Sequence, residues 1–423
     1  MTRPVRHVHL GLGNFFRAHQ AWYSQHAPDG DEWGIAAFSG HSTSTAEQLT
    51  RQGGYTLLTR GPDGDTAEWL TPISEAHPGT DHARLLTVLA DPAVAVVTLT
   101  ITEAGYRADD ADAALLREDL RSPVGSAPAR LVAGLAARRA AGGGPLAVVP
   151  CDNLPANGTV ARDVVLGLAD RVDPALAGWI GETVSFVSTV VDRITPRTTD
   201  ADLARAAELT GRVDAVPVAT EPFSEWMLAG DFPAGRPAWA AGFTDDVTEF
   251  EHRKLRLLNG AHSLLAYAGP PRGHTTVAGA ITDPVCRDWV EQWWDEAAAT
   301  VDLPAGELDN YRAALLTRFA NPRIRHELAQ IAIDGSQKLP VRVAPVLLAS
   351  LAAGADVHPG ARIVAAWIRH LRAGGVRDVA AARAVAAADA GVTDVLGLLD
   401  PALADHAAVR AAVAEQLAEL DRI

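Results

Sequence analysis

The chain has 423 residues, 48% of them hydrophobic, so it is long enough for two or three domains with buried cores. Its formal net charge of −15 argues against nucleic-acid binding, because proteins of that class present basic surfaces to phosphates. Two cysteines, Cys151 and Cys286, exclude a disulfide framework and fit the cytoplasm, and neither a signal-peptide-like start nor an apolar run of about 18 residues indicates secretion or a membrane span.

The N-terminal residues predict a strand, a glycine-containing turn and a helix. Residues 5–10 form the strand, Gly11 and Gly13 form the turn, and a helix-like stretch continues to Ala27. A dinucleotide pyrophosphate binds in this context, because glycines allow a tight turn and a close approach of the backbone. Phe16 stands where the usual fingerprint has its third glycine, so an ordinary strand-to-helix turn is an equally good interpretation.

Later apolar segments predict further strands of a mainly parallel sheet, separated by helices, which indicates an α/β, Rossmann-like domain. These segments are residues 33–38, 93–101, 146–149 and 184–191. Ser39 and Gly40, rather than an acid or an arginine, follow the first of them, so the choice between NAD and NADP stays open. Ligands collect at the carboxyl ends of parallel strands, where Asn153 and Asp192 are expected.

From about Thr244 the sequence becomes alanine-rich and mostly helical. We therefore predict two domains. Residues 1–244 form the Rossmann-like domain, and residues 245–423 form a mostly α-helical C-terminal domain.

Lysine is scarce in this chain. Of 37 basic residues only Lys254 and Lys338 are lysines, and the rest are arginines. A desolvated lysine can give up its proton near neutral pH, whereas arginine cannot. The chain can therefore be keeping lysine where a neutral amine is needed, although drift in an arginine-rich sequence explains the count equally well.

Thr248 and Glu251 have the spacing of a capping box, which predicts the start of a helix that carries Lys254, Asn259 and His262. At about 100° per residue the three side chains fall within an arc of roughly 140°. Oxidising a secondary alcohol requires a base and neutral donors that stabilise the alkoxide. Lys254 can be the base if burial lowers its pKa from about 10.4 to roughly 7–8. Asn153 and Asn259 are candidate donors, and a polar stripe at a domain interface is the alternative interpretation.

Other chemistries find little support. Metal-ligand spacing is absent around the cysteines, and no H-E-x-x-H segment occurs, so we predict no metal. A nucleophilic serine in a G-x-S-x-G segment is also missing.

Seven segments together resemble the polyol-specific long-chain dehydrogenase/reductase family, which includes mannitol 2-dehydrogenases and the reductases of fructuronate and tagaturonate. They are residues 11–20, 100–106, 151–158, 191–196, 221–226, 254–263 and 334–340. They occur in the family's order over most of the chain. The resemblance implies a Rossmann-like domain, a helical C-terminal domain and metal-independent hydride transfer.

The resemblance also implies roles for individual residues. Lys254 matches the general acid/base, Asn153 and Asn259 the oxyanion-stabilising pair, His262 a substrate-orienting residue and Asp192 a residue linked to proton transfer. Lys338 falls on the substrate side. The cofactor site implied by the motifs comprises Gly11, Gly13, Asn14, Phe15, Arg17, Thr102 and Glu103.

The sequence departs from the family at Phe16, where a histidine is common, at Gln330, where some mannitol enzymes carry an arginine, and in its short N-terminus. These departures bear on the substrate more than on the reaction type.

The leading prediction is an NAD-dependent dehydrogenase, with NADP open, that interconverts a polyol and a ketose, D-mannitol and D-fructose being the type reaction. Reduction of a hexuronate, D-fructuronate to D-mannonate, is the alternative. A carboxylate substrate needs a cationic partner, for which Arg193 or Arg342 with Lys338 are candidates, although both arginines also suit structural ion pairs. A dinucleotide-binding regulator without catalysis is a third possibility. The expected partner is a small molecule, and the oligomeric state stays open and is compatible with a monomer.

Overall fold

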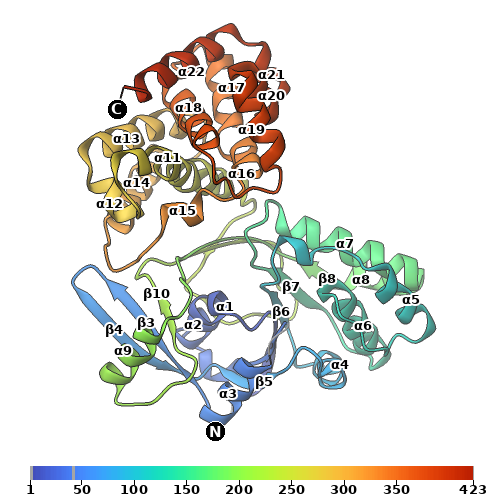
Figure 1. The fold of residues 1–423 in the computed structure, drawn as a ribbon. Coiled ribbons are helices and arrows are strands. Elements are labelled where there is room, and N and C mark those ends of the chain that lie inside the picture. The colour runs from blue at the N-terminus through green and yellow to red at the C-terminus, as the bar shows by residue number, and fades with distance from the viewer. Residues whose placement is uncertain (1–2, 41–42, 423) are drawn as a thin grey trace. The chain divides into compact units, whose positions relative to one another are not determined.

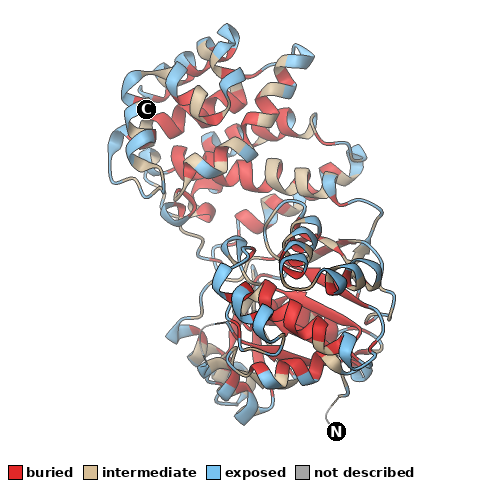
Figure 2. Ribbon diagram, turned by 90° about the vertical axis from the view of Figure 1, so that its right-hand side faces the viewer, coloured by how far each residue is buried: buried red, intermediate tan, exposed pale blue. Residues whose placement is uncertain are grey.

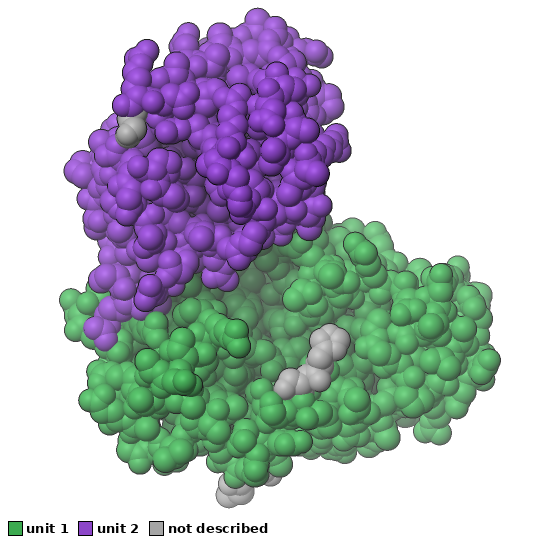
Figure 3. All heavy atoms as spheres, in the orientation of Figure 1, with its two compact units in different colours: residues 1–248 green, residues 249–423 purple. Residues whose placement is uncertain are grey.

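The structure is a computed structural model that describes residues 3–40 and 43–422. The chain divides into two compact units, residues 1–248 and 249–423, which Figure 3 colours separately. The boundary predicted at residue 244 lies close to this division. In the described part of the chain, no helix combines the length and apolar character needed to cross a membrane.

The first unit is built on a six-stranded sheet in which every neighbouring pair of strands is parallel. Counted along the chain within this sheet, the spatial order is 3-2-1-4-5-6, the order of the Rossmann fold. The predicted fold class is thereby confirmed. In spatial order the strands are β5 (Ile73–His77), β2 (Gly34–Phe38), β1 (Val5–Leu10), β6 (Val96–Leu99), β7 (Leu146–Pro150) and β8 (Val184–Phe186).

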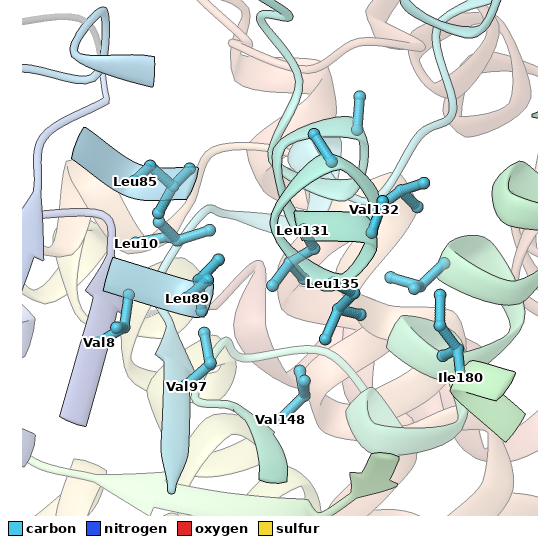
Figure 4. Packing of buried hydrophobic residues seen from close by; sticks show 14 of the residues in the cluster. Val8, Leu10, Leu85, Leu89, Val97, Leu131, Val132, Leu135, Val148 and Ile180 are labelled. Carbon is cyan, nitrogen blue, oxygen red and sulfur yellow. The ribbon is translucent and has the colours of Figure 1, made fainter. Parts of the chain in front are cut away.

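Helices cover both faces of this sheet, which explains why its central strands are apolar along their whole length. On one face Val8 and Val97 of the sheet pack against Leu85, Leu131 and Ile180 of the helices (Figure 4). Figure 2 shows the sheet as the most continuously buried part of the unit. The helices on this face are α4 (His82–Ala90), α5 (Asp110–Glu118), α6 (Ala127–Ala140), α7 (Asn157–Val172) and α8 (Pro174–Thr183).

The other face is covered by α3 (Ser44–Gln52) and by two short helices, α1 (Asn14–Ala18) and α2 (Gln20–Gln25), which replace the one helix predicted through residue 27. The break falls at His19, whose φ of −121° and ψ of −87° are not helical. Phe16 is fully buried here, and its ring stacks on that of His9 with centroids 3.5 Å apart. Phe16 is therefore a core residue in this short helix.

Two small sheets complete the unit together with helices outside the main layers. The first sheet contains β10 (Val218–Thr220), β3 (Tyr55–Gly61) and β4 (Gly64–Leu70), and the second contains β12 (Gly242–Phe243), β11 (Glu225–Ala229) and β9 (Ser188–Asp192). The prediction of one strand over residues 184–191 is wrong, because the chain leaves the main sheet after β8 and continues in another sheet as β9. The remaining helical segments are η1 (Gly30–Glu32), η2 (Glu103–Gly105) and α9 (Asp200–Thr210).

The second unit is helical, as predicted (Figure 1). Its central helix, α11, is buried along all of its residues and packs against α13, α15 and α18. A helix that is buried on every side belongs to the core of its unit, and α11 follows directly on the segment that carries Lys254. The helical segments are α10 (Thr248–Arg253), η3 (Lys254–Asn259), α11 (Gly260–Ala268), η4 (Pro270–Arg272), α12 (Val277–Thr282), α13 (Pro284–Ala298), α14 (Ala305–Phe319), α15 (Leu328–Ile331), α16 (Gly335–Arg342), α17 (Ala344–Ala353), α18 (His358–Ala373), α19 (Ala381–Ala390), α20 (Val392–Leu399), α21 (Pro401–Asp405) and α22 (Ala407–Leu420).

Candidate active site

The glycine turn after β1 lies tight against the neighbouring strand. Gly11 has a φ of +111°, and a Cβ atom there would come 2.0 Å from the carbonyl oxygen of Thr100. Its amide donates to the carbonyl oxygen of Phe38 at the end of β2, 2.9 Å away. Only glycine fits this backbone, because any larger side chain at position 11 would collide with Thr100.

Arg17 supports the turn. Its buried guanidinium donates to the Gly13 carbonyl oxygen (3.3 Å) and to Oδ1 of Asn14 (2.7 Å), and it also bonds to the Val216 carbonyl. Phe15 stacks on the His19 ring, with centroids 5.1 Å apart. In the described structure these side chains brace the turn through protein contacts.

A cavity of about 1450 Å³ opens at this turn, over the carboxyl ends of β1, β2 and β6. Of the predicted cofactor residues, Gly11, Gly13 and Thr102 line it. The other four are not among the described residues that form its wall: Asn14, Phe15, Arg17 and Glu103. The size of the cavity and its place at the strand ends fit a dinucleotide.

Replacing Gly11 by alanine and replacing Gly13 by alanine should have different effects. Gly11→Ala places a methyl group against Thr100 at a positive φ, so it should lower the free energy of unfolding by at least about 1–3 kcal/mol and weaken dinucleotide binding. Gly13→Ala meets no atom closer than 3.8 Å and should fold normally, yet its methyl group enters the cavity and should weaken binding. Thermal unfolding and nucleotide titration of both variants test this pair, and equal stabilities would contradict it.

The loops after β6 and β7 are tied to each other by Asp152. Its carboxylate accepts the Thr102 amide (2.8 Å) and the Tyr106 hydroxyl (2.7 Å). Thr102 and Ala156 have φ values of +68° and +49°, in the left-handed region that non-glycine residues rarely adopt. Such strain collects at binding and catalytic sites.

Asn157 anchors the β7 loop, and with it Asn153, to β9. Its side-chain amide donates to the carbonyl oxygens of Asp152 (3.1 Å) and Thr189 (2.9 Å), and its own oxygen accepts the Thr189 amide (2.9 Å). Asn153 is exposed in this loop, and Asp192, the last residue of β9, is buried. The loop that carries Asn153 is thus fixed to the strand that ends at Asp192.

In the second unit, Lys254 and Asn259 are the first and last residues of a π-helical segment. Backbone hydrogen bonds in a π-helix join residues five apart instead of four, and Lys254 and Asn259 are five apart. The π-helical segment therefore places the side chains of these two residues nearer to the same face of the helix than a regular α-helix would. Single π-helical turns inside α-helices are frequent at functional sites.

Two tryptophans of α13 hold this segment. The indole nitrogens of Trp293 and Trp294 donate to the carbonyl oxygens of Arg256 and Leu257, each at 2.9 Å. A Cβ atom at Gly260 would come 2.6 Å from the Trp293 ring, so glycine is needed for this approach. Carbonyl groups that a wider helix turn releases are thus satisfied by side chains rather than left unpaired.

Asn259 and His262 each present a buried polar atom without a partner. Neither Nδ2 of Asn259 nor Nε2 of His262 has a hydrogen-bond partner in the described structure. The His262 ring stacks on Phe319 (4.6 Å between centroids) and meets the His326 ring edge-on (4.9 Å). Burial, with a smaller effect of His326, Arg342 and Arg318, lowers the pKa of His262 well below its ordinary value, so this imidazole is neutral near pH 7.

The predicted substrate residues occupy different places. Arg342 donates to Oγ of Ser263 in α11 (3.2 Å), and Lys338 donates to the carbonyl oxygen of Ile331 (3.1 Å). Arg193, in the first unit, is buried, donates to backbone carbonyl oxygens and lies over the Trp22 ring. These contacts of Arg193 are those of a structural residue, and its substrate role stays a prediction.

Among the described residues, His274, Asp283 and Cys286 form the one group that could hold a metal ion. The Arg272 guanidinium donates to both oxygens of Asp283, at 2.6 and 3.2 Å, and holds the pKa of that carboxyl far below its usual range. The carboxylate is thus already engaged in an ion pair, and we assign no metal to this group.

The comparisons with known proteins agree with this geometry. The model of the mannitol dehydrogenase Rossmann domain matches residues 5–241, and that of the mannitol dehydrogenase C-terminal domain matches residues 246–420. The chain belongs to the mannitol dehydrogenase family. The resemblance inferred from the seven segments is confirmed, and with it the assignment to the oxidoreductases.

Several members of the mannitol dehydrogenase family are similar over most of their length. The D-mannonate oxidoreductase of Escherichia coli (strain K12) is 40% identical over 86% of this chain and 79% of its own. The structure of Pseudomonas fluorescens mannitol 2-dehydrogenase, solved with NAD and D-mannitol, is 31% identical, with a TM-score of 0.83 over 99% of this chain and 92% of that one. A substrate-free D-sorbitol dehydrogenase gives a TM-score of 0.88 at 29% identity, over 99% and 95% of the two chains.

Sequence reasoning missed the residues that position the site. Asp152, Asn157 and Gly260 lie inside the quoted motifs but were given no role. Trp293 and Trp294 lie outside the motifs. The one feature of the sequence that could have indicated their role is that two tryptophans are adjacent on a helix.

Proposed function

We propose that this protein interconverts a sugar alcohol and a ketose by moving a hydride to or from a nicotinamide dinucleotide. The observation that carries the proposal is the pair of unpartnered, buried polar atoms on Asn259 and His262, beside Lys254 at the start of the π-helical segment. Leaving a buried amide donor unbonded costs about 1–3 kcal/mol, so its presence favours a ligand that bonds to it.

In this proposal Lys254 accepts the hydroxyl proton during oxidation and returns it during reduction. Asn259 donates from Nδ2 to the oxygen on which negative charge develops, and the family resemblance predicts the same role for Asn153. Both are neutral, so they stabilise the alkoxide without holding Lys254 in its protonated form. His262, neutral at pH 7, orients the substrate, and Asp192 passes the proton towards water.

The dinucleotide supplies the hydride acceptor when it is bound, and the cavity at Gly11, Gly13 and Thr102 is its proposed site. NAD is the cofactor that the comparison with the mannitol 2-dehydrogenase complex supports. A cytoplasmic location, supported by two free and buried cysteines, remains our prediction, and the oligomeric state stays open.

A hexuronate is the second candidate substrate, and the charges around His262 favour it. The positive charges of Arg342 and Arg318 help to lower the pKa of the His262 imidazole. Those of Arg318 and Lys338 do the same for His326, whose pKa is lowered, mainly by burial, to about 4. The positive charge of these side chains would attract a carboxylate group on the substrate, whereas a neutral polyol carries no charge for it to act on. The similarity to a D-mannonate oxidoreductase supports the same substrate.

A panel of ketones separates the two candidates. The purified protein is mixed with NADH or NADPH and then with fructose, fructuronate or tagaturonate, and the loss of nicotinamide absorbance is followed. We expect turnover with at least one ketone, unchanged by EDTA. Turnover with fructuronate and not with fructose would assign the hexuronate, and no turnover with any of them, despite nucleotide binding, would overturn the proposed activity.

A further inference from the structure

Two arginines of α6 are buried, and they differ in their partners. Arg138 is fully buried, and its guanidinium donates to the carbonyl oxygens of Leu89, Asp91, Gly144 and Pro145. Arg130 is 5% exposed, yet neither its Nε nor its Nη2 has a partner in the described part of the chain. The same helix therefore holds one satisfied and one unsatisfied buried guanidinium.

A buried charge without a partner is costly. The penalty for taking an ion out of water amounts to several kcal/mol unless an opposite charge or hydrogen bonds offset it. Arg138 meets this requirement with four carbonyl groups. Arg130 does not, so its environment is completed when an anion occupies the space beside it.

Arg130 lies in the wall of the dinucleotide cavity, close to the end of β2. Its guanidinium carbon is 5.9 Å from the centroid of the Phe38 ring, and Phe38 is the last residue of that strand. His82, which the sequence gave no ligand role, is 6% exposed in the same wall, and the exposed Arg107 lines it as well. Burial and the charge of Arg130 lower the pKa of His82, so its imidazole is neutral near pH 7. Two guanidinium groups and one neutral imidazole thus belong to one region of the cavity.

The acidic residues of this wall are engaged elsewhere. Asp112 accepts the amides of Gly125 (3.1 Å) and Ser126 (2.8 Å). Asp109 accepts the amide of Ala111 at the start of α5, and Asp110 pairs with Arg171. None of these carboxylates is a recorded partner of Arg130 in the described structure, so the wall offers no counter-charge that is bonded to its guanidinium.

The position of this charge identifies the anion. In a Rossmann fold the pyrophosphate lies at the glycine turn, and the adenosine ribose lies at the end of the second strand. An acid at that end binds the 2′-hydroxyl group of NAD, whereas a nearby arginine accommodates the 2′-phosphate of NADP. Here Ser39 and Gly40 follow the strand, and the Ser39 hydroxyl accepts the Gly79 amide at 3.0 Å.

We propose that Arg130, with His82 and Arg107, forms a binding site for the 2′-phosphate of NADP, so that this chain takes NADP in preference to NAD. The inference rests on the proposed function in one respect, namely that the cavity holds a nicotinamide dinucleotide. An alternative role for Arg130, stacking on the adenine ring, would not distinguish the two cofactors.

Binding of two fragments to the full-length protein tests the site without any turnover. Adenosine 2′,5′-bisphosphate carries the 2′-phosphate, and adenosine 5′-monophosphate lacks it. We expect calorimetry to show at least about tenfold tighter binding of the bisphosphate to the wild-type protein. Arg130→Met should weaken the bisphosphate by about 10- to 100-fold, the usual range for a hydrogen-bonded charge, and leave the monophosphate unchanged.

Folding of the variant does not confound this test. Replacing an unpaired buried charge with an apolar side chain of similar volume is neutral or stabilising, so Arg130→Met without ligand should unfold at the same temperature or higher. The matched control is Arg139→Met on the same helix, because Arg139 is partly exposed and paired with Asp173 at 3.4 Å. This control should change the binding of neither fragment.

Three results would overturn the inference. The first is equal binding of both fragments to the wild-type protein. The second is an equal loss of both in Arg130→Met, which would indicate stacking on adenine. The third is failure of both fragments to bind, which would also count against the cavity as a dinucleotide site. In the first two cases the ketone panel can still detect turnover with NADH, so the proposed function would stand while this inference fails.

Discussion

Lys254→Ala should lose most of its turnover and keep its affinity for the dinucleotide. A positioned general acid/base contributes about 10²- to 10⁴-fold to rate, and we expect kcat to fall within that range. The proposed dinucleotide cavity is lined by residues of the first unit, whereas Lys254 belongs to the second, so binding of the cofactor should persist. Stopped-flow kinetics and titration of nicotinamide fluorescence measure the two quantities separately.

The pH dependence gives this prediction a second readout. Alcohol oxidation in the wild-type protein should accelerate as pH rises and Lys254 loses its proton, and ketone reduction should slow over the same range. His262 does not titrate there, because burial holds its pKa well below the ordinary value, and burial lowers that of His326 to about 4. In Lys254→Ala this pH dependence should disappear, and added alkylamines should restore part of the rate.

Lys338→Ala is the matched control, since it removes the other lysine, which donates to two backbone carbonyl oxygens. Its pH profile should keep the wild-type shape even if its KM changes. If Lys254→Ala retained near-normal turnover, or if its residual rate kept the wild-type pH profile, the assignment of the base would be wrong.

The Rossmann domain could be predicted because its signal lies in short, continuous stretches. The strands β2, β6 and β7 are buried at every position, and this requires the apolar runs that the sequence displays. The strands β3 and β4 were missed because their exposure is mixed, which blurs the alternation of polarity. The break between β8 and β9 leaves no mark in the sequence, because residues 184–191 form one continuous strand-like stretch although the two strands join different sheets.

The chemistry of the site could be read from residue types, and its geometry could not. The scarcity of lysine pointed to Lys254 before any fold was known. The π-helical segment depends on Trp293 and Trp294, which lie 37 residues further along the chain and donate to its carbonyl groups. An angle calculated for a regular α-helix cannot contain such a tertiary effect.

Arg130 shows the same limit at the cofactor site. In the sequence it is one of many arginines in an alanine-rich helix, with nothing to set it apart from Arg138. Only the burial of each guanidinium and the identity of its acceptors distinguish the structural arginine from the ligand candidate. Glycine motifs locate the pyrophosphate, whereas discrimination at the ribose depends on side chains that come from several elements.

Asn259→Leu should lose activity without losing stability. Removing one donor to a developing oxyanion costs about 10²- to 10³-fold in kcat, so we expect a loss of that size with little change in cofactor affinity. The same change removes a buried Nδ2 that has no partner in the described structure, and it substitutes an apolar side chain of similar size. The free energy of unfolding should therefore stay the same or rise.

Asn157→Leu is the contrasting variant, because the same substitution there removes an amide whose nitrogen and oxygen are both bonded. It should lower the free energy of unfolding by about 1–3 kcal/mol, since the carbonyl oxygen and the amide of Thr189 lose their partner. If Asn259 is retained for the reaction, denaturant titrations should find Asn259→Leu at least as stable as the wild-type protein and Asn157→Leu less stable. The kcat of Asn259→Leu should fall although its stability does not. If both variants were destabilised alike, Asn259 would be a structural residue, and Lys254 would need another oxyanion donor beside it.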